Sequence, residues 1–180
     1  MTGVQTCALP ISLPRVDDVF AAIKGKKVFS TLDLMKGYWQ IGIQPCDRHL
    51  TAFITPTGLY ESTVLTFGLT NAPSTFQRFM NKIFCDMIER KQVVVYLDDI
   101  LVMGATITEH NNILREVVSR LSKNGLIVRF DKCDFGKQKI KFLGFIIGQE
   151  EIQVDTKKID AIVNWPPPKT VTEQIGRAHV

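Results

Sequence analysis

The sequence predicts an α+β fold in which helices pack on one face of an antiparallel sheet. Two long segments carry apolar residues at helical spacing, and they lie among several short segments that alternate like strands. These elements do not follow the regular strand–helix–strand order that a parallel sheet requires. The chain has 180 residues, of which 45% are hydrophobic, and this is enough for one globular domain with a core.

The first half of the chain predicts a helix, several strands and then a long helix. Residues 15–25 have helical spacing and end at Gly25, which suits a helix stop. Alternating segments predict strands over 27–34, 38–44, 49–55 and 57–65. The long helix is expected to begin with Asn71 as its cap and Pro73 in its first turn. Its apolar stripe consists of Phe76, Phe79, Met80, Ile83, Phe84 and Met87.

The second half predicts a strand pair, another long helix and further strands. Residues 92–103 indicate two short strands around a turn. The second long helix is expected to run from Thr108, as its cap, to Gly125. Its inward-facing residues are predicted to be Ile113, Leu114, Val117, Val118 and Leu121. Strands are then expected within 125–130, 139–147 and 152–155, and a last helical turn within 157–165.

Composition and charge exclude several classes of protein. With 22% charged and 9% aromatic residues, the chain is neither disordered nor fibrous. A net charge of +4 is compatible with a nucleic-acid partner but does not by itself indicate one. The four cysteines are widely scattered with no C-x-x-C pair, which indicates reduced thiols and an intracellular protein. Since no apolar stretch reaches about 18 residues, we expect no membrane partner.

The segment "VVVYLDDILV", residues 93–102, places two adjacent carboxylates between two apolar strands. Asp98 and Asp99 could simply form an exposed hairpin turn, where Asp tolerates unusual backbone angles. The preferred two-residue turns, however, are Asn-Gly and Asp-Gly. Two adjacent negative charges repel each other, and a divalent cation would remove that cost.

Asp33 lies near the end of another apolar strand, in "FSTLDL". If the two strands are neighbours in one sheet, Asp33, Asp98 and Asp99 converge at its edge. Carboxylate oxygens suit Mg²⁺, and two such ions about 3.5–4 Å apart activate a hydroxyl and stabilise a leaving pyrophosphate. The sequence therefore predicts a nucleotidyl-transfer site at this edge.

Five motifs, taken together and in this order, resemble the reverse transcriptase of long-terminal-repeat retrotransposons of the Gypsy (Ty3) group. They are "FSTLDLMKGYWQI", "TFGLTNAPSTFQRFMN", "VVVYLDDILV", "KCDF…KIKFLG" and "KKIDAIVNWPPP". The resemblance covers about residues 12–170 and implies a polymerase palm fold and RNA-directed DNA polymerase activity with two Mg²⁺ ions, or Mn²⁺ in their place. It also implies an RNA template, a DNA/RNA primer-template duplex and dNTP as partners. Other parts of a Gag-Pol polyprotein (thumb, ribonuclease H and integrase) and a cytoplasmic virus-like particle follow from the same resemblance.

The resemblance also implies roles for individual residues. Asp33, Asp98 and Asp99 match the catalytic, metal-binding aspartates. The expected nucleotide-binding residues are Leu34, Gly37, Tyr38, Phe67, Gly68, Gln77 and Leu97, and the expected primer grip is Phe142, Leu143 and Gly144. Tyr38 matches the aromatic gate against a ribose 2′-hydroxyl, although a half-buried strand aromatic is the alternative and is the role we expect for Trp39. Lys132 is a candidate general acid toward pyrophosphate, with an ordinary solvated lysine as the alternative.

This chain departs from the family pattern at three positions, none of which is a carboxylate. They are Gly42, Thr66 and Phe145, where the family usually has Arg, Pro and His. We interpret these departures as lineage variation. A palm-like nucleotide cyclase is a further alternative, but the template and primer motifs argue against it.

The two ends of the chain look foreign to the domain. A DNA string that encodes "IGRAHV", residues 175–180, has a reverse complement that, in another frame, encodes Thr6 to Pro10 and the start of the Ile11 codon. We therefore interpret residues 1–11 and 173–180 as translated sequencing adapter. Residues 12–150 are then expected to be a palm with partial fingers, and 151–172 the start of a connection to a thumb. On this interpretation the chain is a fragment, and a truncated palm that binds nucleic acid and Mg²⁺ without catalysis is the alternative function.

Overall fold

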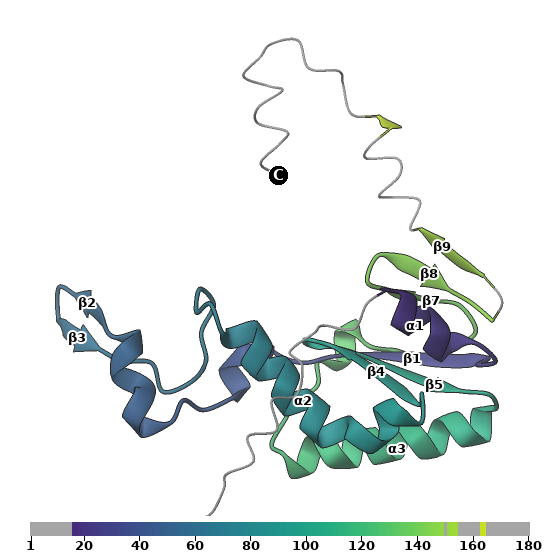
Figure 1. The fold of residues 1–180 in the computed structure, drawn as a ribbon, viewed down its shortest axis with the longest axis horizontal. Coiled ribbons are helices and arrows are strands. Elements are labelled where there is room, and N and C mark those ends of the chain that lie inside the picture. The colour runs from purple at the N-terminus through teal and green to yellow at the C-terminus, as the bar shows by residue number, and fades with distance from the viewer. Residues whose placement is uncertain (1–15, 150, 155–162, 165–180) are drawn as a thin grey trace, which may run out of the picture.

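The computed structural model describes residues 16–149, 151–154 and 163–164. Its central sheet is antiparallel, in the order β4 (Val93–Tyr96), β5 (Asp99–Gly104), β1 (Val28–Asp33) and β6 (Asp134–Lys137). A second antiparallel sheet contains β7 (Ile140–Phe142), β8 (Phe145–Ile147) and β9 (Ile152–Val154). The hairpin of β2 (Phe53–Thr55) and β3 (Gly58–Tyr60) stands at the end of an arm, away from both sheets (Figure 1).

The two long helices pack on one face of the central sheet. They are α2 (Ala72–Glu89) and α3 (Ile107–Lys123), and they share a core with alternate strand residues such as Leu32, Val95 and Ile100. The other face carries the short helix α1 (Val16–Ile23) and the second sheet, which bury the intervening residues, among them Phe29 and Leu101 (Figure 1). The predicted α+β architecture is confirmed. Of the helices α1, α2 and α3, α1 lies on the face opposite the other two.

The helix stripes follow the sequence pattern closely. In α2, the side chains of Phe76, Met80, Phe84 and Met87 are fully buried, because residues three or four apart share one face of a helix. Asn71 precedes α2 as predicted, but its side chain makes no capping hydrogen bond. In the described residues, no helix is long and apolar enough to cross a membrane.

Two expectations for α3 are wrong. The cap is Thr106 and not Thr108, because Thr106 has an extended backbone and its hydroxyl accepts a hydrogen bond from the Glu109 N–H at 3.2 Å. Val118 is 40% exposed, since the buried face is set by Ile113, Val117 and Leu121, spaced four residues apart.

Several predicted strands are shorter than expected or are replaced by 3-10 turns. Residues 38–44 contain the 3-10 helix η1 (Gly37–Gln40), because Lys36 has a left-handed backbone that turns the chain out of β1. The strand predicted over 49–55 shrinks to β2 after η2 (Pro45–Thr51), and the strand predicted over 57–65 shrinks to β3. Within 125–130 an isolated Leu34–Val128 bridge precedes η3 (Phe130–Lys132). The helical turn expected within 157–165 lies outside the described residues, apart from 163–164.

Candidate active site

Four side chains form one cross-strand row at the end of the central sheet. In the antiparallel register, Asp33 of β1 lies opposite Asp99 of β5, and Asp99 lies opposite Tyr96 of β4. On the other side of β1, the Leu34–Val128 bridge brings Arg129 opposite Asp33, and the Arg129 N–H donates to the Asp33 carbonyl at 2.8 Å. Directly opposite residues point to the same face of a sheet. The row is therefore Tyr96, Asp99, Asp33 and Arg129.

Asp98 lies on the turn between β4 and β5, just outside this row. Its carbonyl accepts a hydrogen bond from the Leu34 N–H at 3.1 Å, which ties the turn to the residue after Asp33. Gly37 packs against the Asp98 side chain: an added Cβ would lie 3.0 Å from Asp98 Cγ and 3.2 Å from Phe76 Cζ. Only a residue without a side chain fits at position 37 without displacing a neighbour.

The carboxylates of this site repel one another. Partial burial raises the pKa of Asp98, and the charge of Asp33 raises it further. Partial burial also raises the pKa of Asp99, as do the charges of Asp33 and Asp98, while the charge of Lys132 lowers it. A bound cation would relieve this repulsion, because it favours the ionised carboxylates.

The donor set fits a hard divalent cation such as Mg²⁺, which prefers carboxylate oxygens. Asp33 and Asp99 are adjacent across the strands, and Asp98 is near enough for its charge to interact with theirs. Among the described residues, no three His, Cys, Asp or Glu side chains are gathered closely enough to form a metal site as they stand. The structure thus brings together two of the three predicted carboxylates and places the third beside them.

An open cleft of about 390 Å³ joins the carboxylates to the second sheet. Its lining residues are Thr31, Leu32, Asp33, Asp99, Lys132, Asp134, Lys141, Phe142, Leu143 and Gly144. The predicted primer grip is the β7–β8 turn, in which Leu143 (φ 51°) and Gly144 (φ 81°) both have left-handed backbones between the paired Phe142 and Phe145. This is the geometry of a tight type I′ hairpin turn. The predicted primer grip and Lys132 therefore face the same cleft as Asp33 and Asp99.

Gln77 lies beneath the Asp98–Asp99 turn. It is 2% exposed, and its amide nitrogen donates to the Val95 carbonyl at 3.0 Å and to Asn81 Oδ1 at 2.8 Å. Its amide oxygen accepts the Leu97 N–H at 2.8 Å, where Leu97 has a left-handed backbone with φ of 52°. Gln77 therefore holds the turn, a role that the sequence reasoning missed. The available signal was a polar residue beside the apolar stripe of α2, and nucleotide contact by Gln77 stays a prediction.

An aromatic cluster borders Asp98 on the side away from the row. Tyr38 is 8% exposed and makes edge contacts with Phe67 and Phe76, with ring centroids 5.2 and 5.5 Å away. Burial raises the pKa of Tyr38, and the charge of Asp98 raises it further, so the two side chains are close. Phe67 is largely exposed and precedes Gly68, whose φ is 91°. Tyr38 lies on η1 and is buried, so the alternative of a half-buried strand aromatic is wrong for it, and the gate role stays a prediction.

Leu34 and Trp39 are placed differently from what the sequence led us to expect. Leu34 is 2% exposed, so its side chain belongs to the core. Trp39 lies on η1 and not on a strand; the residue is 47% exposed, and the Lys36 ammonium lies 4.8 Å from the ring centroid. Trp39 is thus about half-buried as expected, but the expectation that it lies on a strand is wrong.

Comparison with protein families matches residues 3–147 to "Reverse transcriptase (RNA-dependent DNA polymerase)". The chain is 38% identical over 156 residues to the retrovirus-related Pol polyprotein from transposon 297 of Drosophila melanogaster, covering 87% of the chain and 15% of that polyprotein. It is 40% identical over 161 residues to the corresponding polyprotein of transposon opus from the same organism, and covers 16% of it. It is 34% identical over 161 residues to a Tf2-3 transposon polyprotein of Schizosaccharomyces pombe, and covers 12% of that polyprotein.

Solved structures show the same fold. The foamy viral protease-reverse transcriptase in complex with RNA/DNA hybrid superposes with a TM-score of 0.81 and 26% identity, covering 95% of this chain and 23% of the viral chain. The same viral enzyme in complex with dsDNA gives a TM-score of 0.73 and 31% identity, covering 82% and 30%. The predicted fold class is thereby confirmed.

Proposed function

Because this chain belongs to the reverse transcriptase (RNA-dependent DNA polymerase) family, we propose that it provides the catalytic centre for RNA-directed DNA synthesis in a Gypsy/Ty3-type retrotransposon polyprotein. The observation that carries the proposal is the cross-strand pairing of Asp33 with Asp99 beside the Asp98 turn. This pairing brings residues 66 positions apart in the sequence to one edge of the sheet. The chain spans 15% of the transposon 297 polyprotein, so the activity of the whole protein is part of the proposal.

In this proposal, Asp33, Asp98 and Asp99 hold two Mg²⁺ ions, with Mn²⁺ as a substitute. When bound, the metal supplies Lewis-acid activation of the primer 3′-hydroxyl and stabilises the charge on the leaving pyrophosphate. The protein supplies rigidity, because the strand register fixes Asp33 and Asp99 while Gln77 fixes the turn that carries Asp98. Such preorganised placement of charged groups is a main source of catalytic rate.

The remaining site residues take positioning roles in the proposal. The β7–β8 turn would position the primer end across the cleft, since Leu143 and Gly144 line it opposite Asp33 and Asp99. Lys132 lines the same cleft and would donate an Nζ proton to pyrophosphate. Tyr38, beside Asp98, would contact the sugar of the incoming nucleotide.

The substrates of the proposal are an RNA template, a DNA/RNA primer-template duplex and dNTP. The foamy viral relatives were solved with RNA/DNA hybrid and dsDNA, which supports a duplex in the cleft of this chain. The transposon relatives are Pol polyproteins, which supports a polyprotein as the setting of this chain. Thumb, ribonuclease H and integrase regions as partners, and a cytoplasmic virus-like particle as the place of action, are further parts of the proposal.

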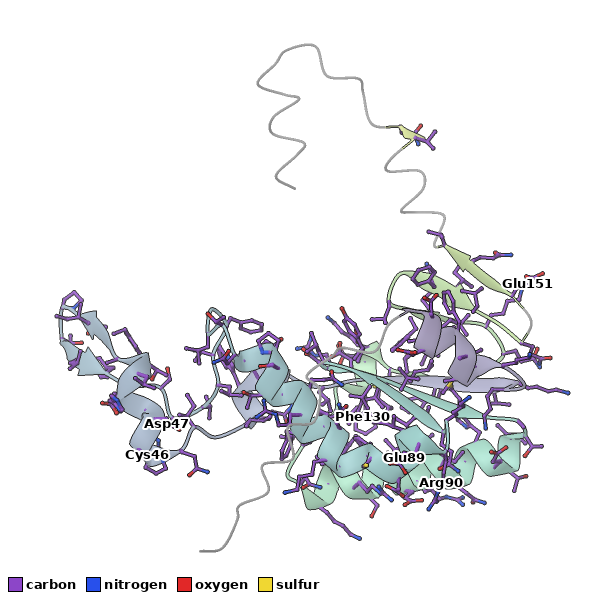
Figure 2. All side chains as sticks on the ribbon, viewed as in Figure 1. Cys46, Asp47, Glu89, Arg90, Phe130 and Glu151 are labelled. Atoms are coloured by element: carbon purple, nitrogen blue, oxygen red, sulfur yellow. The ribbon has the colours of Figure 1, made fainter. Side chains whose placement is uncertain are left out.

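We further propose that this chain alone extends primers poorly. The β2–β3 hairpin exposes apolar side chains on both faces: Ile54 is 84% exposed, Leu59 is 71% exposed, and Phe53 stacks with Tyr60 on the other side. Figure 2 shows Cys46 and Asp47 on the same arm, apart from the central sheet. Two-stranded hairpins are marginally stable without packing partners, so the arm would not hold a substrate rigidly.

Primer extension on an RNA template with Mg²⁺ tests both parts of the proposal. The assay compares the chain with a chimaera in which residues 28–147 replace the matching segment of the transposon 297 polyprotein. We expect little extension by the chain, extension by the chimaera, and loss of extension in the Asp98→Asn chimaera. An Asp98→Asn chimaera as active as its parent would reject the catalytic assignment, and robust extension by the chain alone would reject the second part.

A further inference from the structure

Arg129 occupies a fixed position beside the proposed metal ligand Asp33. Its backbone N–H bonds the Asp33 carbonyl at 2.8 Å, and the Leu34–Val128 bridge precedes this bond. The Arg129 Nε lies 4.0 Å from Asp33 Oδ1, and about 30% of each side chain is exposed. The guanidinium is therefore held next to the carboxylate by backbone pairing and not by the ion pair alone.

Arg129 also begins the segment that brings a second basic side chain, that of Lys132, to the site. Arg129 is the N-cap of η3, whose last residue is Lys132, and Lys132 lines the cleft with Asp99. Asp33 thus has Arg129 nearby and Asp99 has Lys132 nearby, and both basic residues come from the same 3-10 turn. An arginine side chain stays charged at every physiological pH, so its effect on the site is permanent.

We propose that Arg129 is a built-in competitor of the divalent cation at Asp33, which keeps the metal affinity of the substrate-free protein low. The inference rests on the proposed function, because it requires Asp33 to be a metal ligand. A positive charge next to the carboxylate repels an approaching divalent cation and neutralises part of the negative potential that attracts it. Removing this charge should therefore tighten metal binding.

Titration of the full chain with Mn²⁺, followed by the electron paramagnetic resonance signal of the free ion, measures this effect. A unit charge about 5 Å from a divalent ion, screened by salt, changes the affinity by about fivefold. We expect Arg129→Gln to bind Mn²⁺ about fivefold more tightly than the wild type, and Arg129→Lys to remain near the wild type. Arg115→Gln is the matched control, because it removes the same charge from an exposed position on α3.

Asp33→Asn separates failure of the inference from failure of the proposed function. If Asp33→Asn does not weaken Mn²⁺ binding, Asp33 is not a metal ligand and both are overturned. If Asp33→Asn weakens binding but Arg129→Gln leaves it unchanged or weakens it, the competitor role alone is overturned. Circular dichroism and thermal melting check the fold of each variant, and Arg129→Leu makes the same charge change should the Gln variant not fold.

Discussion

The side-chain oxygen of Gln77 accepts the backbone N–H of Leu97 at 2.8 Å, which links the second turn of α2 to the turn that presents Asp98 and Asp99. The same amide donates to the Val95 carbonyl on the strand before the turn. A left-handed backbone at a residue such as Leu97 is unfavourable unless its surroundings hold it. Gln77 is the residue that provides this hold.

Replacing Gln77 should therefore loosen the catalytic turn. Gln77→Leu leaves the Leu97 N–H and the Val95 carbonyl without their partner, and we expect a loss of about 1–3 kcal/mol in unfolding free energy. Urea denaturation measures this loss. Gln138→Leu is the control, because Gln138 is exposed. A Gln77→Leu protein as stable as this control would show that the amide does not support the turn.

Gly37→Ala should disturb Asp98 directly. The added methyl would lie 3.0 Å from Asp98 Cγ and 3.2 Å from Phe76 Cζ, so one of them must move. Overpacking of this kind costs about 1–3 kcal/mol. Gly42→Ala is the matched control, because its nearest neighbour, the Thr63 carbonyl oxygen, is 3.9 Å away. Chemical denaturation should separate the two variants, and equal losses would contradict the packing argument.

Asp98→Asn should stabilise the metal-free protein at pH 7. Burial, together with the charge of Asp33, raises the folded-state pKa of Asp98 above its unfolded value of about 3.9. The folded protein thus binds more protons between these two pKa values, and stability falls as the pH rises through that window. The penalty is fully present above the folded pKa and absent below the unfolded one. Denaturation with a chelator present should show that Asp98→Asn has a higher unfolding free energy than the wild type at pH 7, and that this difference vanishes near pH 3.5. A difference of equal size at both pH values would contradict the argument.

The ion pair of Arg120 with Asp86 should stabilise the packing of α3 on α2. The Arg120 guanidinium donates to both Asp86 carboxylate oxygens and, at 2.9 Å, to the Ile83 carbonyl. Hydrogen bonding by Arg120 lowers the pKa of Asp86 to about 2, so the stabilisation is present above pH 4 and lost as the pH falls toward 2. Because Asp86 is 41% exposed, screening limits the loss in Arg120→Met to about 1 kcal/mol. Thermal melts of Arg120→Met and Arg115→Met should differ, and coincident curves would contradict the role.

The sequence was sufficient to predict the main elements and the carboxylates, because those patterns are local. The stripe of α2 and the apolar runs on either side of Asp98–Asp99 need no knowledge of their partners. The strand expected over 38–44 failed because alternation does not show whether a strand has a neighbour, and Gly42 forms only an isolated bridge with Val64. The predicted cap of α3 was wrong because Thr106 and Thr108 are both suitable cap residues, and only the backbone conformation distinguishes them.

The contacts that support the site depend on long-range register. Arg129 stands 96 positions after Asp33, and no periodicity links the two residues. Gln77 was expected to bind the nucleotide, and its burial beneath the Asp98–Asp99 turn follows from how α2 lies under β4. Such relationships become visible only when the sheet order is known.

The most direct test of the central claim is single-turnover primer extension by the chimaera, with Asp33→Asn compared with Asp134→Asn. Both aspartates line the same cleft, but only Asp33 belongs to the row that contains Asp99. If the row is the metal centre, Asp33→Asn should lower the rate at least about 1000-fold, because losing a metal ligand removes several kcal/mol of transition-state stabilisation. Asp134→Asn should stay within about tenfold of the parent. Equal rates for the two variants would contradict the account.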